Sequence, residues 1–133
     1  MIGYVTLGTD DLDRARAYYD ALLGTIGAKR LMQFPEDDGG FTMYGTSMAQ
    51  PALVITRPYD KQSPDCGNGN MIAIVMDEQA KVDAFHAKAI ELGGTDEGPP
   101  GYRGDPSFGY YFAYFRDPDG HKLAAFNIAP PSA

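Results

Sequence analysis

The stretch from Tyr110 to Phe126, YYFAYFRDPDGHKLAAF, decides the fold. Two apolar, aromatic-rich runs flank its central tetrapeptide, DPDG, at Asp117 to Gly120. Proline presets φ, aspartate can cap its own backbone, and glycine accepts a positive φ, so the stretch predicts a tight β-hairpin. The second strand, from Lys122 to Phe126, contains no carboxylate. This strand therefore cannot supply a carboxylate ligand to a metal ion.

Working outward, the first 57 residues predict one strand, one helix and three further strands. Ile2 to Gly8 is short and β-branched, and the aspartates that follow it are good helix N-caps. Apolar residues then recur at spacings of three and four, which predicts an amphipathic helix ending between Gly24 and Gly27. The three later strands are expected at residues 30–34, 41–45 and 52–57.

The second half of the chain repeats this pattern after a polar, turn-rich linker at residues 58–69. A strand is expected at 70–76, and Asp77 opens a helix whose apolar face is formed by Val82, Phe85, Ala89 and Leu92. An offset of 67 aligns the first strand and helix of the two halves. An offset of 70 aligns the hairpins and pairs Tyr44 with Tyr114, which leaves about three extra residues near Glu97 to Gly109. Each half is therefore expected to be β-α-β-β-β.

Composition indicates a single compact domain, and its acidic balance allows a cationic or neutral small ligand. The chain has 133 residues, 44% of them hydrophobic, which is enough for one sizeable core. A formal charge of −7 and an isoelectric point near 4.6 argue against nucleic acid and against an anionic membrane, because both require clustered lysine and arginine. No run of 18 apolar residues occurs, so no membrane segment is expected.

Two features predict a cytoplasmic protein. Cys66 is the only cysteine, so no internal disulfide is possible and a reducing compartment fits. The first residues, MIGYVTLGTDDL, lack the basic and apolar regions of a signal peptide. The thiol lies in an acidic loop beside Asp65, which disfavours the thiolate, so we do not expect Cys66 to be a nucleophile.

The tandem repeat and three of its segments resemble the vicinal oxygen chelate superfamily, which includes glyoxalase I, extradiol dioxygenases, and fosfomycin- and bleomycin-resistance proteins. The segments are VTLGTDDLDRARAYYDALLG, VDAFHAKAIELGG and YFRDPDGHKLAAF. The resemblance implies an α+β fold in which βαβββ modules at residues 1–57 and 70–128 curl their mixed sheets into a cleft, with the helices outside. It also implies a homodimer.

The same resemblance argues against a metal cofactor. In the metal-dependent relatives, the ligands come from the first and last strands of each module. In this sequence the corresponding positions are Tyr4, Val54, Met71 and Ala124. A phenol, a thioether and two alkyl groups do not form a binding set for Zn²⁺, Ni²⁺, Fe²⁺ or Mg²⁺. We therefore expect no metal and no other cofactor.

A cleft without an ion is expected to bind a small organic molecule through aromatic and thioether side chains. The opposing interpretation is that its strand aromatics are ordinary core or dimer-interface residues. The expected ligand-binding residues are Tyr4, Tyr44, Arg57, Met71, Arg103, Phe112, Tyr114 and Phe126.

The segment Gly98 to Gly109 is long and rich in glycine and proline, which predicts a lid over the cleft. Tyr102 and Arg103 would then offer a ring and an anion-binding fork, unless Arg103 only pairs with Asp105. Neither histidine is expected to act in catalysis. His86 lies within the second helix, where packing is favoured, and His121 is expected to be exposed at a strand start.

Three functions remain open. The first is a metal-free binding protein of the bleomycin-resistance kind, which sequesters an aromatic or cationic compound. The second is a metal-independent enzyme in which Tyr4 or Tyr114 acts as an acid or base. The third is a lyase of the glyoxalase I type, which the four metal-ligand positions oppose.

Overall fold

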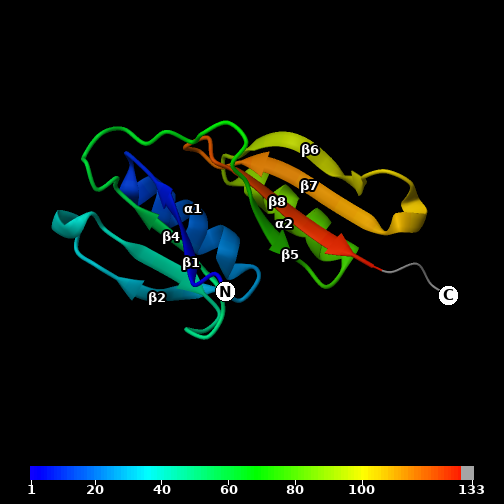
Figure 1. The fold of residues 1–133 in the computed structure, drawn as a ribbon, viewed down its shortest axis with the longest axis horizontal. Coiled ribbons are helices and arrows are strands. Elements are labelled where there is room, and N and C mark those ends of the chain that lie inside the picture. Colours follow the sequence, from blue (N-terminus) through cyan, green and yellow to red (C-terminus); the bar gives the residue numbers. More distant parts are fainter. Residues whose placement is uncertain (130–133) are drawn as a thin grey trace. The chain divides into compact units, whose positions relative to one another are not determined.

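The computed structural model describes residues 1–129. The chain divides into two compact units, with the boundary between Cys66 and Gly67. Each unit carries one helix and one open four-stranded sheet (Figure 1). Within the described residues, no helix is long and apolar enough to cross a membrane.

In the first unit, the sheet has the strand order β1-β4-β3-β2. Strands β1 and β4 run parallel, and the other neighbours are antiparallel. Its elements are β1 (Tyr4–Gly8), α1 (Leu12–Gly24), β2 (Lys29–Gln33), the 3-10 turn η1 (Glu36–Asp38), β3 (Thr42–Gly45) and β4 (Ala52–Thr56).

The second unit repeats this topology with the strand order β5-β8-β7-β6. Strands β5 and β8 run parallel, and the others are antiparallel. The prediction of an α+β fold built from two βαβββ modules is confirmed. The elements are β5 (Ile72–Val75), α2 (Gln79–Glu91), β6 (Thr95–Tyr102), η2 (Pro106–Phe108), β7 (Tyr110–Arg116) and β8 (Lys122–Ile128).

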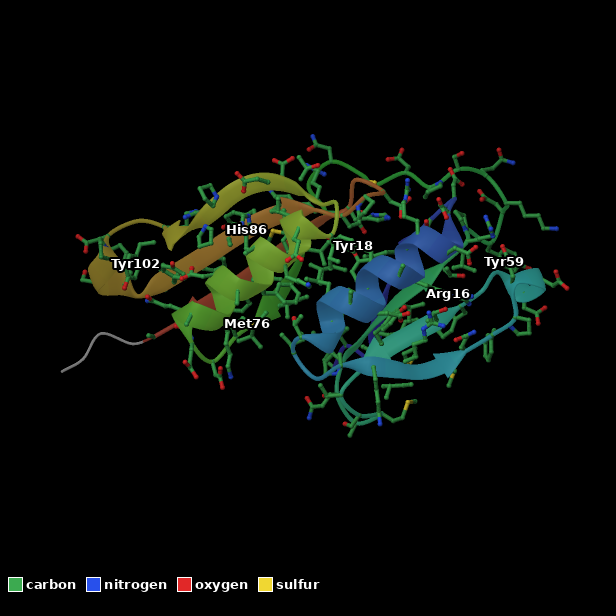
Figure 2. The ribbon with its side chains drawn as sticks, turned by 180° about the vertical axis from the view of Figure 1, so that it is seen from behind. Arg16, Tyr18, Tyr59, Met76, His86 and Tyr102 are labelled. Atoms are coloured by element: carbon green, nitrogen blue, oxygen red, sulfur yellow. The ribbon has the colours of Figure 1, made fainter. Side chains whose placement is uncertain are left out.

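Each helix covers one face of the sheet in its own unit (Figure 2). Helix α1 begins where the Asp11 carboxylate accepts a hydrogen bond from the Arg14 amide at 3.0 Å, which satisfies one of the free donors of the first turn. Its apolar side is buried over Leu53 and Ile55. Helix α2 buries Phe85, whose ring centroid lies 6.0 Å from that of Phe115 on β7.

The predicted hairpin is present as β7 and β8, and the side chain of Asp117 organises its turn. The Asp117 carboxylate is buried and accepts hydrogen bonds from the amides of Asp119 (3.0 Å) and His121 (2.9 Å). Gly120 has φ of 94°, a left-handed conformation that glycine adopts without steric cost. His121 is only 7% exposed, so the expectation of a solvent-exposed histidine is wrong: the tight turn folds this residue inward.

The alignment of the two halves that made Tyr44 equivalent to Tyr114 is wrong by one residue. In the first unit Tyr44 pairs with Leu53 and faces α1, whereas in the second unit Phe115 pairs with Leu123 and faces α2. Tyr44 therefore corresponds to Phe115. Because side chains alternate across a strand, a slip of one residue moves a side chain to the opposite face of the sheet.

Part of the segment predicted to form a lid, from Gly98 to Tyr102, belongs to the sheet. Strand β6 continues to Tyr102 and pairs with β7, with two register shifts between Asp96 and Gly101. Turn η2 follows, and then β7 begins. The glycines and prolines that suggested a loop are accommodated by the irregular register, which relaxes the regular ladder.

Candidate binding site

We call the face of each sheet turned away from its helix the distal face. In the second unit, three aromatic rings form a ladder on the distal face of β7 and β8. The ring centroids of Phe126 and Phe112 lie 5.1 Å apart with an interplanar angle of 11°, and those of Phe112 and Tyr114 lie 6.0 Å apart at 15°. All three side chains are half-buried, so part of each ring contacts solvent. This aromatic ladder unites three of the predicted ligand-binding residues.

The ladder follows directly from strand register. Phe112 pairs with Phe126, and two residues further along β7 Tyr114 pairs with Ala124. Side chains two residues apart share a face, so the three rings line up on one side of the hairpin. The neighbours of Tyr114 on both adjacent strands are small, Ala124 on β8 and Gly98 on β6. A Cβ at Gly98 would lie 2.9 Å from Cδ2 of Tyr114, so glycine makes room for the ring.

Two cationic side chains lie over the ring of Tyr114. The guanidinium carbon of Arg103 and the ammonium nitrogen of Lys122 are each 5.2 Å from its centroid, within the range of a cation–π interaction. Arg103 was expected from the sequence, whereas Lys122 was missed. Lys122 could have been found from the alternation of side chains along β8, because Lys122 and Ala124 share a face.

Arg103 does not pair with Asp105. Its Nη2 donates to the carbonyl of Pro99 at 2.9 Å, and its Nη1 donates to that of Gly101 at 3.0 Å. The guanidinium is therefore held by backbone carbonyls of β6, the strand that precedes it. The Asp105 carboxylate instead accepts a hydrogen bond from the Ser107 amide at 2.8 Å and caps η2. Contacts with Ser107 lower the pKa of Asp105.

Arg116 lies at the end of the same face, but its charge is matched. Its Nε donates to the Glu97 carboxylate at 2.6 Å, and its Nη1 donates to the Gly120 carbonyl at 2.8 Å. These contacts join the end of β7 to the segment of β6 beside it and to the hairpin turn. We therefore assign Arg116 a role in holding the hairpin.

In the first unit, a smaller aromatic cluster surrounds Tyr4. The Tyr4 ring is 52% exposed and meets Phe41 edge-on, with centroids 5.8 Å apart. Phe41 in turn stacks on Phe34 with a centroid distance of 5.4 Å. Sequence analysis identified Tyr4 but not these two partners, whose only signal was their position on either side of the turn at residues 35–40.

Arg57 and Met71 lie outside both aromatic groups. Arg57 donates to the Glu36 carboxylate at 2.6 Å and to the Asp10 carbonyl at 2.9 Å, so it ties the end of β4 to η1 and to the loop after β1. Met71 precedes β5 and is partly exposed.

Tyr44 does not line a distal face, because it is equivalent to Phe115 and not, as predicted, to Tyr114. Its side chain is 2% exposed beneath α1, and its hydroxyl donates to the Asp20 carboxylate at 2.8 Å. Burial, together with the hydrogen bond to Asp20, raises the pKa of Tyr44 far above its ordinary value. The two carboxylate oxygens of Asp20 also accept hydrogen bonds from Arg30, at 2.8 and 2.7 Å. Tyr44 therefore belongs to the core.

The positions that would hold a metal in related folds do not fit one. Tyr4, Val54, Met71 and Ala124 supply no imidazole and no carboxylate. Across residues 1–129, no three His, Cys, Asp or Glu side chains are grouped so that they could hold a metal ion. His86 lies on α2 (Figure 2). Its Nε2 is 2.9 Å from the Asp96 carboxylate, and its ring packs near Phe115.

The fold, built from two βαβββ modules, is that of the vicinal oxygen chelate class of proteins. Comparison with protein families supports this class directly. A model of the Glyoxalase/Bleomycin resistance protein/Dioxygenase superfamily matches residues 1–125. The chain belongs to this superfamily.

Three solved structures illustrate the similarity. A glyoxalase/bleomycin resistance protein from Albidiferax ferrireducens T118 is 35% identical, with 97% of this chain and 99% of that chain covered and a TM-score of 0.80. The V278E mutant of glyoxalase I from Zea mays is 28% identical, with 93% and 44% covered and a TM-score of 0.72. TnmS3, an antibiotic binding protein from Streptomyces sp. CB03234, is 22% identical, with 97% and 96% covered and a TM-score of 0.67. A search of curated sequences gave no significant match.

Proposed function

We propose that this protein binds a small organic molecule that contains an aromatic ring, and that it does so without a metal ion. The observation that carries the proposal is the aromatic ladder of Phe126, Phe112 and Tyr114, which is half-exposed on the distal face of β7 and β8. Aromatic rings offer large apolar area and favour stacked or edge-on contact with another ring. Buried aromatic side chains would ordinarily be turned toward the helix, as Phe115 is.

Two further observations support this function over metal-assisted chemistry. The donor set at the four metal-ligand positions suits no divalent cation. The fold is also compatible with binding as a sole function, since TnmS3 shares it and is described as an antibiotic binding protein. We include Tyr114, Phe112, Phe126 and Arg103 in the proposed site.

The test uses thermal shift against a panel of aromatic metabolites and drugs, with turnover assayed for every hit. We expect several compounds to raise the melting temperature of the wild-type protein, because a ligand that binds only the native state stabilises it. Binding can be confirmed by quenching of tyrosine fluorescence, since the chain contains nine tyrosines and no tryptophan. Turnover of a hit would show that the site catalyses a reaction as well as binding.

The matched variants are Phe112→Leu and Phe108→Leu. Both lose one phenylalanine ring from the second unit, but Phe108 lies in η2, outside the ladder, and is 54% exposed. We expect Phe112→Leu to weaken ligand binding about tenfold, the loss of one well-placed aromatic contact, and Phe108→Leu to leave it unchanged. Equal binding by the two variants would rule out the ladder as the binding surface.

We also propose that the protein is a homodimer. Several large apolar side chains remain exposed outside the ladder, including Val75 and Ile128, and burial of such side chains is a common driving force for association. Light scattering coupled to size-exclusion chromatography at micromolar concentration should give twice the chain mass of 14.4 kDa. A monomer at that concentration would contradict the proposal.

A further inference from the structure

From the charges around the ladder, we propose that the bound molecule carries an anionic group beside its aromatic ring, and that Arg103 and Lys122 hold that group. The inference rests on the proposed function, because it names the class of ligand for the same site. Its basis is that two cations lie over one ring: Cζ of Arg103 and Nζ of Lys122 are both 5.2 Å from the centroid of Tyr114.

Neither cation is neutralised by the protein. Within residues 1–129, no carboxylate lies within ion-pair distance of Arg103 or Lys122, although the chain has seven more negative than positive charges. The acidic residues nearest to Arg103 in sequence are engaged elsewhere. Glu97 pairs with Arg116 at 2.6 Å, and Asp105 accepts the Ser107 amide. In an acidic protein, two unmatched cations at one ring form a local positive site.

Arg103 is held in place before any ligand binds. Hydrogen bonds to the carbonyls of Pro99 and Gly101 fix the guanidinium, and the ring of Tyr114 supports it. A Cβ at Gly98 would lie 3.2 Å from Nη2 of Arg103, so the strand approaches the guanidinium closely only because glycine is present. A guanidinium has five donors, and these bonds leave Nε–H and further N–H groups for a ligand. A preorganised arginine loses little entropy on binding, which favours recognition of an anion.

The same arrangement disfavours a cationic ligand. Tyrosine rings attract cations, but here the ring of Tyr114 already has two positive charges over it, and a third would be repelled by both. An anion would relieve the repulsion between Arg103 and Lys122 and could accept hydrogen bonds from each. An aromatic carboxylate or phenolate satisfies both the ladder and the two cations.

The experiment compares three probes that share one ring system and differ in charge: 2-naphthoate, 2-naphthamide and 2-naphthylmethylammonium. Affinities are measured by titration calorimetry for the wild type, for Lys122→Met, and for the control Lys88→Met, which removes the same charge from the exposed outer side of α2. We expect naphthoate to bind at least about tenfold more tightly than naphthamide, as charge-assisted hydrogen bonds allow, and the ammonium probe to bind most weakly.

Lys122→Met should reduce the preference for naphthoate over naphthamide severalfold, whereas Lys88→Met should leave it intact. Raising the salt concentration from 50 mM to 500 mM should reduce the preference as well, because exposed charges are screened. Equal binding of naphthoate and naphthamide, or tighter binding of the ammonium probe, would overturn the anionic ligand while leaving the ladder as the site. Phe112→Leu separates the two proposals, since it should weaken all three probes alike. If none of the probes binds, both proposals fail.

Discussion

At the residue scale, the hydroxyl of Tyr44 shows how one buried polar atom is accommodated. The oxygen lies beneath α1 and donates to Asp20, whose carboxylate is also held by Arg30. Burial alone would raise the pKa of Asp20, but the hydrogen bonds from Arg30 and Tyr44 outweigh it and lower that pKa. Buried polar groups of this kind stabilise a fold only while each keeps its partner.

We expect Tyr44→Phe to lower the free energy of unfolding by about 1.5–3 kcal/mol, the range for loss of one hydrogen bond to a charged group. Urea denaturation followed by circular dichroism measures the change. The control is Tyr59→Phe, which removes the same hydroxyl from a fully exposed side chain in the linker and should leave stability unchanged.

The pH dependence of the same variant provides a second readout. The pKa of Tyr44 is raised in the folded state, so its stabilising contribution is complete below the ordinary value of 10.0 and declines as the pH rises above it. Between pH 9 and pH 11, the wild type should therefore lose stability more steeply than Tyr44→Phe. Parallel curves for the two proteins would contradict the assigned environment of Tyr44.

At the scale of the element, the β7–β8 hairpin determines the proposed site. Its turn fixes the register, and the register places Phe112 opposite Phe126. The Asp117 carboxylate holds the turn by accepting hydrogen bonds from two backbone amides, one of which belongs to the buried His121. A substitution that alters the turn should therefore also alter the positions of the rings in the ladder.

We expect Asp117→Ala to destabilise the protein by about 1–3 kcal/mol, because it leaves a buried amide without its acceptor. Asp117→Asn keeps one side-chain oxygen and should cost less. Guanidinium denaturation compares the two variants. An asparagine variant as unstable as the alanine variant would indicate that the negative charge of Asp117 matters more than the hydrogen bonds described here.

At the scale of the whole chain, the repeated βαβββ pattern places one metal-ligand position on each of four strand regions. Tyr4 and Val54 belong to the first unit, and Met71 and Ala124 belong to the second. In both halves these positions carry side chains without imidazole or carboxylate groups. Because a zinc-type site takes three or four such ligands, substitution of one position by histidine should not by itself create a metal site.

We therefore expect chelators to have no effect on this protein. Treatment with EDTA should leave both the melting temperature and ligand affinity unchanged, and adding Ni²⁺ or Zn²⁺ should produce no saturable shift in melting temperature. Elemental analysis of protein purified without chelator should give far less than one metal per chain. Stoichiometric metal that is lost together with ligand binding would overturn the assignment of the four positions.

The sequence by itself determined the class of fold, both helices and the hairpin. These follow from local physics: apolar periodicity, aspartate at a helix start, and the turn chemistry of DPDG. It also placed Phe112, Tyr114 and Phe126 on one face, because alternation within a strand of known register is a short-range rule. Arg103 was predicted to bind ligand from a lid; the structure places it over the ring of Tyr114, and its role in binding stays a prediction.

Only the tertiary structure decided what depends on register between strands and on packing over a long separation. It moved Tyr44 to the core, because a one-residue difference between the two hairpins exchanges the faces of β3. It placed the first part of a predicted lid, Gly98 to Tyr102, in β6, and it buried His121. It also brought Lys122 to the ring of Tyr114. Contacts of this kind arise between strands, and alternation within one strand indicates the face of a side chain but not its neighbour on the next strand.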